Sequence, residues 1–148
     1  MKMRNSRGYT LLETLIVLFV VSSFLFLPSL ALDKFQQTQE NQQFYGSFEK
    51  HVISAQELAI TSVQECTIKL TENQRKICFD FGMGKETRWQ LTLPKNVVLD
   101  SSKGTIGFTI SGSTKEIGNV VFMDKLSNKH VKYQFELGSG KYRKTEYY

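Results

Sequence analysis

Residues 8–18 of this 148-residue chain read GYTLLETLIVL, and they join a short basic segment to a long apolar one. The eight residues that end at Gly8, MKMRNSRG, carry three positive charges and no negative charge. From Thr14 to Leu32 no charged residue occurs over 19 positions. At about 1.5 Å per residue, a helix of this length approaches the roughly 30 Å hydrocarbon core of a bilayer. Because the excess of Lys and Arg lies only on the N-terminal side, we expect that end in the cytoplasm and the bulk of the chain outside.

One carboxylate, Glu13, stands at the beginning of this apolar run. A secretory signal peptide and a plain membrane anchor also combine a basic start with an apolar core, but neither accounts for Glu13. An ionised carboxylate near hydrocarbon costs several kcal/mol, about 3 on insertion scales for comparable charges. Pro28 lies further along the run and predicts a kink in the helix, because proline removes one backbone hydrogen bond.

The segment from Asp33 to Glu65 reads as a continuing amphipathic helix. Its first part, residues 34–43, is nearly all polar, and we expect it to bridge the membrane and the folded domain. The later apolar residues recur at steps of three or four, which predicts that they pack against a sheet: Phe44, Phe48, Val52, Ala55 and Ala59.

After Cys66 the apolar residues alternate with polar ones, which is the period of a β-strand. Polar turns divide this part of the chain into candidate strands at residues 66–70, 76–81, 88–93, 97–99, 105–110, 119–124, 129–137 and 141–148. The predicted fold class is α+β. We expect a long N-terminal helix packed on one C-terminal antiparallel sheet of about six or seven strands.

Charge and motif content exclude several classes of function. The net charge is +5, and three of these charges lie in the first eight residues, so overall basicity is weak evidence for nucleic-acid binding. There is no Cys/His cluster with metal-ligand spacing, no recognisable catalytic arrangement and no phosphate-binding glycine loop. The sequence therefore predicts no metal, no cofactor and no enzymatic activity.

The pattern GYTLLETLIVL resembles the class III signal of type IV pilins and pseudopilins. That signal has a glycine before the cleaved bond, an apolar helical run and a glutamate five residues into the mature chain. The resemblance implies that a prepilin peptidase cleaves between Gly8 and Tyr9, removes residues 1–8 and N-methylates Tyr9. The family usually has phenylalanine at the first mature position, so Tyr9 is a departure. Residues 9–32 would form the transmembrane and filament-core helix, residues 33–65 the amphipathic helix, and residues 66–148 the sheet domain.

The same resemblance implies a role for Glu13 in assembly. In the family, its counterpart neutralises the terminal amine of a neighbouring subunit, which here would be the amine of Tyr9. Two unit charges about 4 Å apart gain about 4 kcal/mol at an effective dielectric constant of about 20. This attraction would offset much of the cost of burying Glu13. The alternative is that Glu13 reaches the membrane surface and has no partner.

A second resemblance extends over more of the chain. The leader, the sheet-rich tail and the stretch FELGSGKYR look like the minor pseudopilins of the ComGD type in Gram-positive competence machinery. This implies a structural subunit of a competence type IV pilus needed for DNA uptake. Its partners would be the other major and minor competence pilins, first at the cell membrane and then at the cell surface. The glycine pattern of the tail is also similar to minor pilins related to type II secretion, so a type II secretion-like or general type IV minor pilin is the alternative.

Two further features leave alternatives open. A hairpin centred near Glu72 would place Cys66 opposite Cys78, and a domain outside the cell permits a disulfide; two buried free thiols are the other interpretation. The C-terminus interleaves cations with tyrosines, which could hold DNA at a pilus tip, or could form a solvated edge strand whose lysines discourage edge pairing. The cations of this cluster are Lys141, Arg143 and Lys144.

Overall fold

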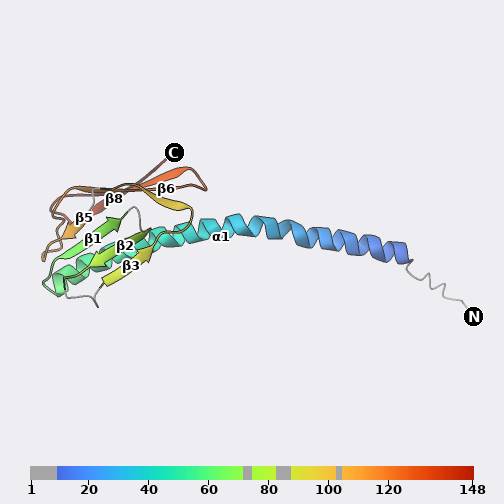
Figure 1. Ribbon diagram of the computed structural model, residues 1–148, viewed down its shortest axis with the longest axis horizontal. Helices are drawn as coiled ribbons and strands as arrows, with labels where there is room; N and C mark the ends of the chain where they lie inside the picture. Colours follow the sequence, from blue (N-terminus) through green and yellow to red (C-terminus); the bar gives the residue numbers. More distant parts are fainter. Residues whose placement is uncertain (1–9, 72–74, 83–87, 103–104) are drawn as a thin grey trace, which may run out of the picture. The chain divides into compact units, whose positions relative to one another are not determined.

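The computed structural model describes residues 10–71, 75–82, 88–102 and 105–148, of which residues 27–31, 71 and 102 by their backbone alone. One helix is followed by eight strands (Figure 1). The elements are α1 (Leu11–Thr61), β1 (Cys66–Thr71), β2 (Lys76–Asp80), β3 (Arg88–Thr92), β4 (Val97–Ser102), β5 (Thr105–Phe108), β6 (Gly118–Asp124), β7 (Lys129–Phe135) and β8 (Tyr142–Tyr147). The chain divides into two compact units, residues 1–37 and 38–148, and α1 contributes to both.

The first unit consists of the N-terminal part of α1. The chain is helical through position 28, and the kink predicted at Pro28 stays a prediction. Within the described residues, no helix is both long enough and apolar enough to cross a membrane.

In the second unit, the predicted apolar face of α1 is confirmed as the centre of the core. Its five residues are all less than 5% exposed: Phe44, Phe48, Val52, Ala55 and Ala59. The ring of Phe48 meets those of Phe122 and Tyr133 edge to face, with centroids 5.2 and 5.0 Å apart. Such pairs add about 0.5–1.5 kcal/mol each to the burial of their apolar area. This aromatic packing joins α1 to β6 and β7.

The strands form two four-stranded antiparallel sheets, and the expected single sheet of six or seven strands is wrong. Sheet A has the order β3-β2-β1-β5, and sheet B has the order β4-β6-β7-β8. The positions of all eight strands follow the alternation in the sequence closely. The division arises because β5 pairs with β1, whereas β4 pairs with β6, although β5 lies between β4 and β6 in the sequence. Alternation locates a strand but does not choose its neighbour.

A small junction holds the two sheets together. Thr114 bridges to Phe108 on one side and to Leu137 on the other, and its hydroxyl donates to the carbonyl of Glu136. The amide of Gln56 on α1 donates to the carbonyl of Gly112 at 2.8 Å. Helix and both sheets therefore meet at the loop that contains Gly112.

Helix α1 ends at Thr61, whereas the sequence predicted helix as far as Glu65. The N–H of Gln64 donates to the carbonyl of Ala59 at 3.2 Å, and Val63 between them has φ of 53°. This is the Schellman arrangement, in which the residue at the position of Val63 is usually glycine. A β-branched residue in the left-handed region is strained, and Val63 is 67% exposed, so packing contributes little in return.

Val63→Gly is therefore expected to raise the free energy of unfolding by about 0.5–1 kcal/mol. The removal of left-handed strain, about 1–2 kcal/mol, exceeds the extra chain entropy of glycine in the unfolded state. Urea unfolding of the purified full-length protein measures this. Val63→Ala is the control, because alanine keeps the Cβ that causes the strain. A lower stability for Val63→Gly than for Val63→Ala would contradict the interpretation.

Candidate functional site

The N-terminus of α1 is capped by the residue that precedes Leu11. The hydroxyl of Thr10 accepts a hydrogen bond from the N–H of Glu13 at 3.3 Å, and the carbonyl of Thr10 accepts from the same N–H at 3.0 Å. Thr10 is thus the N-cap, and Glu13 stands three residues later in the first turn. The sequence Thr-Leu-Leu-Glu has the spacing of a capping box. The predicted cleavage residues Gly8 and Tyr9 lie outside the described residues.

This position gives Glu13 a structural task besides the predicted one. A carboxylate in the first turn interacts favourably with the positive end of the helix dipole, typically by about 0.3–1 kcal/mol. Glu13 is exposed on the helix, so its side chain is accessible to a second molecule. Glu13 could be singled out from the sequence, and the Thr-x-x-Glu spacing is a sufficient signal for Thr10, which was not predicted.

The helix surface around and beyond Glu13 is mostly apolar. Its large side chains are 45–82% exposed: Leu11, Leu12, Leu15, Ile16, Val17, Leu18, Phe19, Val20, Val21, Phe24, Leu25 and Phe26. A helix that is apolar all round is normally buried in a core or in a membrane. This surface is therefore suited to burial against lipid or against other helices, with Glu13 as its one described carboxylate.

Both cysteines are free thiols in the structure, and the hairpin register that would place Cys66 opposite Cys78 is not the observed one. The residue opposite Cys78 in the β1–β2 ladder is Lys69, three positions from Cys66. Successive side chains of a strand point to opposite faces, so an odd shift of register places the two cysteines on opposite faces of sheet A. Cys66 lies on the core face and is 1% exposed, while Cys78 is half-buried on the other face.

The two thiols should consequently differ in reactivity. Burial, and secondarily the carboxylate of Asp80, raises the pKa of Cys66 to about 12. Cys66 is then a protonated, inaccessible thiol at neutral pH, and the thiolate is the reactive form. Mass spectrometry after iodoacetamide treatment is expected to show one adduct, at Cys78, on the native protein and two after denaturation without reductant. A denatured protein with no adduct would instead indicate a disulfide.

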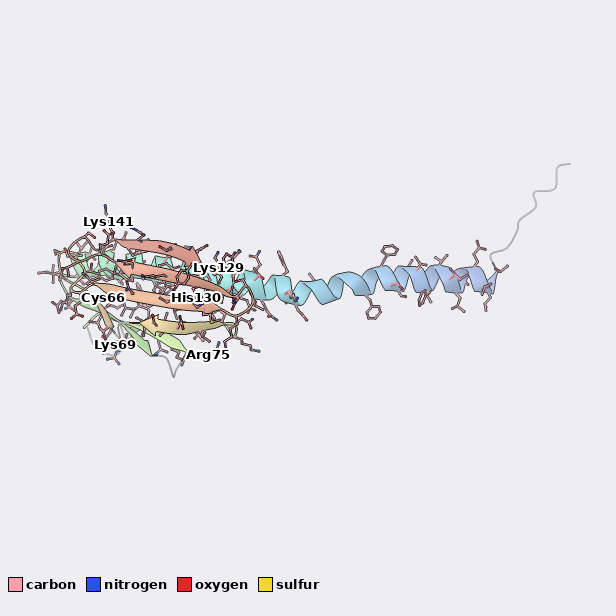
Figure 2. The ribbon with its side chains drawn as sticks, turned by 90° about the horizontal axis from the view of Figure 1, so that it is seen from above. Cys66, Lys69, Arg75, Lys129, His130 and Lys141 are labelled. Atoms are coloured by element: carbon pink, nitrogen blue, oxygen red, sulfur yellow. The ribbon has the colours of Figure 1, made fainter. Side chains whose placement is uncertain are left out.

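The C-terminal cations do not form one basic surface. Lys144 lies on the face of β8 that meets α1, and its Nζ is 2.9 Å from Oε1 of Glu49 and 3.7 Å from Oε1 of Glu146. Arg143 points to the opposite face, 3.6 Å from Oε1 of Glu136. Lys141 lies at the other end of sheet B from Lys129 (Figure 2). The carboxylates partly neutralise Lys144 and Arg143, which weakens the case for a DNA contact there.

A polar groove between α1 and sheet B was not predicted from the sequence. It has a volume of about 630 Å³ and is lined by side chains of α1, of the β6–β7 turn, of β7 and of β8. Two buried polar residues on α1, Asn41 and Tyr45, form part of its wall. No sequence pattern marks it, since its residues are far apart in the chain. Among the described residues, no three His, Cys, Asp or Glu side chains are grouped so that they could hold a metal ion.

Comparisons with known proteins agree with this geometry. The model of the prokaryotic N-terminal methylation motif matches residues 3–26. The chain is similar to competence protein ComGD of Streptococcus pneumoniae (strain ATCC BAA-255 / R6), with 27% identity over 140 residues, 95% of this chain and 80% of that protein.

Two solved structures have a similar fold. The minor pseudopilin EpsH from the type 2 secretion system of Vibrio cholerae matches with a TM-score of 0.57 and 17% identity, over 72% of this chain and 96% of that one. The type IV minor pilin FimU of Pseudomonas aeruginosa (strain PAO1) matches with a TM-score of 0.57 and 10% identity, over 74% of this chain and 90% of that one. The α+β fold, a long helix packed on antiparallel sheets, is therefore pilin-like.

The methylation motif covers the capped start of α1 and the glutamate in its first turn. It implies processing by a prepilin peptidase, membrane anchoring and then assembly with other pilins. The chain thus carries an N-terminal methylation motif over residues 3–26 and has a pilin-like fold.

Proposed function

We propose that this chain is a minor pseudopilin, a structural subunit of a Gram-positive competence type IV pilus that is needed for DNA uptake in transformation. The observation that carries the proposal is the first turn of α1, where Glu13 follows the cap Thr10 on an otherwise apolar, exposed helix. The similarity to a competence protein along nearly the whole chain supports the assignment to competence.

In this proposal, a prepilin peptidase removes residues 1–8 and methylates the new terminus at Tyr9. Residues 9–32 hold the subunit in the membrane and later form part of the filament core, while residues 33–65 and 66–148 lie outside. Burial of the apolar surface of α1 against helices of other competence pilins, major and minor, would drive assembly. Glu13 would set the register of the subunit through the amine of a neighbouring chain.

Gene deletion with separate assays of transformation and protein secretion tests the proposal. Transformation is expected to be lost and secretion to be unchanged. A complementing copy of the gene should restore transformation, whereas a copy with Gly8→Glu, which blocks close approach of the peptidase, should not. Loss of secretion with normal transformation would favour the alternative, a type II secretion-like or general type IV minor pilin.

A pilus-tip DNA-binding subunit is the second alternative, and the ion pairs of Lys144 and Arg143 make it less favoured. DNA binding by the purified full-length protein that weakens steeply with salt, and is lost on Lys141→Ala with Arg143→Ala, would support it.

A further inference from the structure

The groove between α1 and sheet B contains a fixed polar network. The amide of Asn41, on α1, donates to Oδ1 of Asp124 at 2.9 Å. The N–H of Leu126 donates to the same oxygen, and the hydroxyl of Ser127 donates to Oδ2, each at 2.9 Å. These three donors hold the carboxylate of Asp124, which is only 8% exposed, at the wall of the groove.

Two atoms beside this network lack a partner among the described residues. Because the amide nitrogen of Asn41 binds Asp124, its Oδ1 is turned away from that carboxylate, and it accepts no hydrogen bond. The hydroxyl of Tyr45, one helical turn later, also has none. Asn41 is 1% exposed and Tyr45 is 9% exposed, so bulk water does not replace the missing partners. Unpartnered polar atoms at this depth are uncommon in folded proteins and each has an appreciable cost.

The charges around the two atoms favour a cation. The wall of the groove carries three carboxylates, Glu49, Asp124 and Glu146, and two ammonium groups, Lys129 and Lys144. Burial, and then the carboxylates of Asp124 and Glu146, raises the pKa of Tyr45, so its hydroxyl keeps its proton. An ammonium or guanidinium group, which has several donors, could serve Asn41 Oδ1 and the Tyr45 oxygen at once.

Binding of such a group to the two buried atoms requires side chains at the rim of the groove to move aside. At the rim, the Nζ of Lys144 lies 5.9 Å from the centroid of the Tyr45 ring and would have to exchange its ion pairs with Glu49 and Glu146 for new ones. Tyr148, also at the rim, is 88% exposed and therefore has few contacts to hold it. A volume of about 630 Å³ is ample for one long basic side chain.

We propose that this groove is a docking site for an Arg or Lys side chain of another pilin-like subunit, which binds Asn41 Oδ1 and the Tyr45 hydroxyl. The inference rests on the proposed function, because it requires assembly with other subunits. It adds to that function a contact between globular domains, separate from the contact between apolar helices. The partner's cation replaces the hydrogen bonds that the isolated chain lacks.

Site-directed photo-crosslinking in cells with an intact pilus operon tests this contact. A benzophenone amino acid is placed at Gln42, which is exposed and lines the groove, or at Gln43, which is exposed but does not line it. A third chain carries it at Val17, on the apolar part of α1. We expect Gln42 and Val17 to give adducts with another pilin-like subunit, and the Gln42 adduct to map near an Arg or Lys of that subunit. Gln43 should give little.

Tyr45→Phe then separates binding from stability. It removes a hydroxyl with no partner, so the melting temperature of the purified protein should stay the same or rise. The yield of the Gln42 adduct should fall about tenfold, while the Val17 adduct persists. Tyr133→Phe is the matched control, because its hydroxyl donates to Glu49 at 2.9 Å, and its loss should lower the melting temperature by about 5 °C.

Each outcome decides a different point. A Val17 adduct without a Gln42 adduct would overturn the docking site and leave the proposed function standing. An unchanged Gln42 yield in Tyr45→Phe would overturn it as well, and would indicate that the contact with the other subunit does not involve the Tyr45 hydroxyl. Loss of all adducts, Val17 included, would contradict assembly itself and with it both proposals.

Discussion

Replacing Gly140 with alanine is expected to lower the free energy of unfolding by about 3 kcal/mol or more and the melting temperature by about 10 °C. Gly140 has φ of 65°, a conformation that costs other residues about 1–2 kcal/mol. An added Cβ would also lie 2.1 Å from the carbonyl oxygen of Gly112 and 2.1 Å from Nε2 of Gln56. Nε2 of Gln56 donates a hydrogen bond to this carbonyl oxygen at the junction of the sheets, so neither atom can move away without loss of that hydrogen bond.

Gly138→Ala is the matched control for this prediction. Gly138 has φ of 77°, yet its added Cβ would meet nothing within 4 Å. It should therefore cost only the backbone strain, about 1–2 kcal/mol. Thermal and urea unfolding of the two full-length variants give the comparison. Equal losses for Gly138→Ala and Gly140→Ala would show that the junction yields, and that strain alone matters there.

Glu13→Ala is expected to abolish incorporation of the subunit into pili, with leader cleavage and membrane insertion retained. The reason is the lost attraction to the terminal amine of a neighbouring subunit, about 4 kcal/mol at an effective dielectric constant of about 20. The capped first turn suggests a sharper comparison. Glutamine at position 13 keeps a capping-box residue but has no charge, so Glu13→Gln should fail to assemble as Glu13→Ala does.

Immunoblots of sheared pilus fractions measure incorporation, and the mobility shift of the processed chain measures cleavage. Thr10→Ala provides the opposite change. It removes the Thr10 hydroxyl that accepts from the N–H of Glu13, and it keeps the charge of the Glu13 side chain. It should assemble, with at most a modest loss. Normal assembly of Glu13→Gln together with failure of Thr10→Ala would assign Glu13 to the helix end and not to a partner subunit.

Much of the fold could be predicted because its signals are local. The steps of three and four from Phe44 to Ala59 marked the buried face of α1, and these residues are buried. The alternation from Lys129 onward marked β7, whose core-facing residues Val131, Tyr133 and Phe135 are at most 2% exposed. In each case the period of the backbone dictates which side chains share a face.

The features that could not be predicted depend on which segments meet. The register of β1 and β2 places Cys66 and Cys78 on opposite faces, whereas a hairpin centred near Glu72 would have placed them opposite each other. The groove joins Asn41 on α1 to Asp124, 83 positions later, and nothing near either residue indicates the contact. Thr10 is different, since its capping signal was local and was overlooked.

The sequence by itself determined the helix, its buried face, the strand positions and the signal around Glu13, because hydrophobic periodicity and residue chemistry act over a few neighbouring positions. The tertiary structure alone decided that the strands divide into two sheets, that the cysteines stay apart, and that Gly112, Gly140 and Gln56 meet at a junction. It also decided that Asn41 Oδ1 and the Tyr45 hydroxyl lie beside a groove with no hydrogen-bond partner among the described residues. These outcomes depend on packing between distant segments, where pairing partners compete and local patterns are equally compatible with several arrangements.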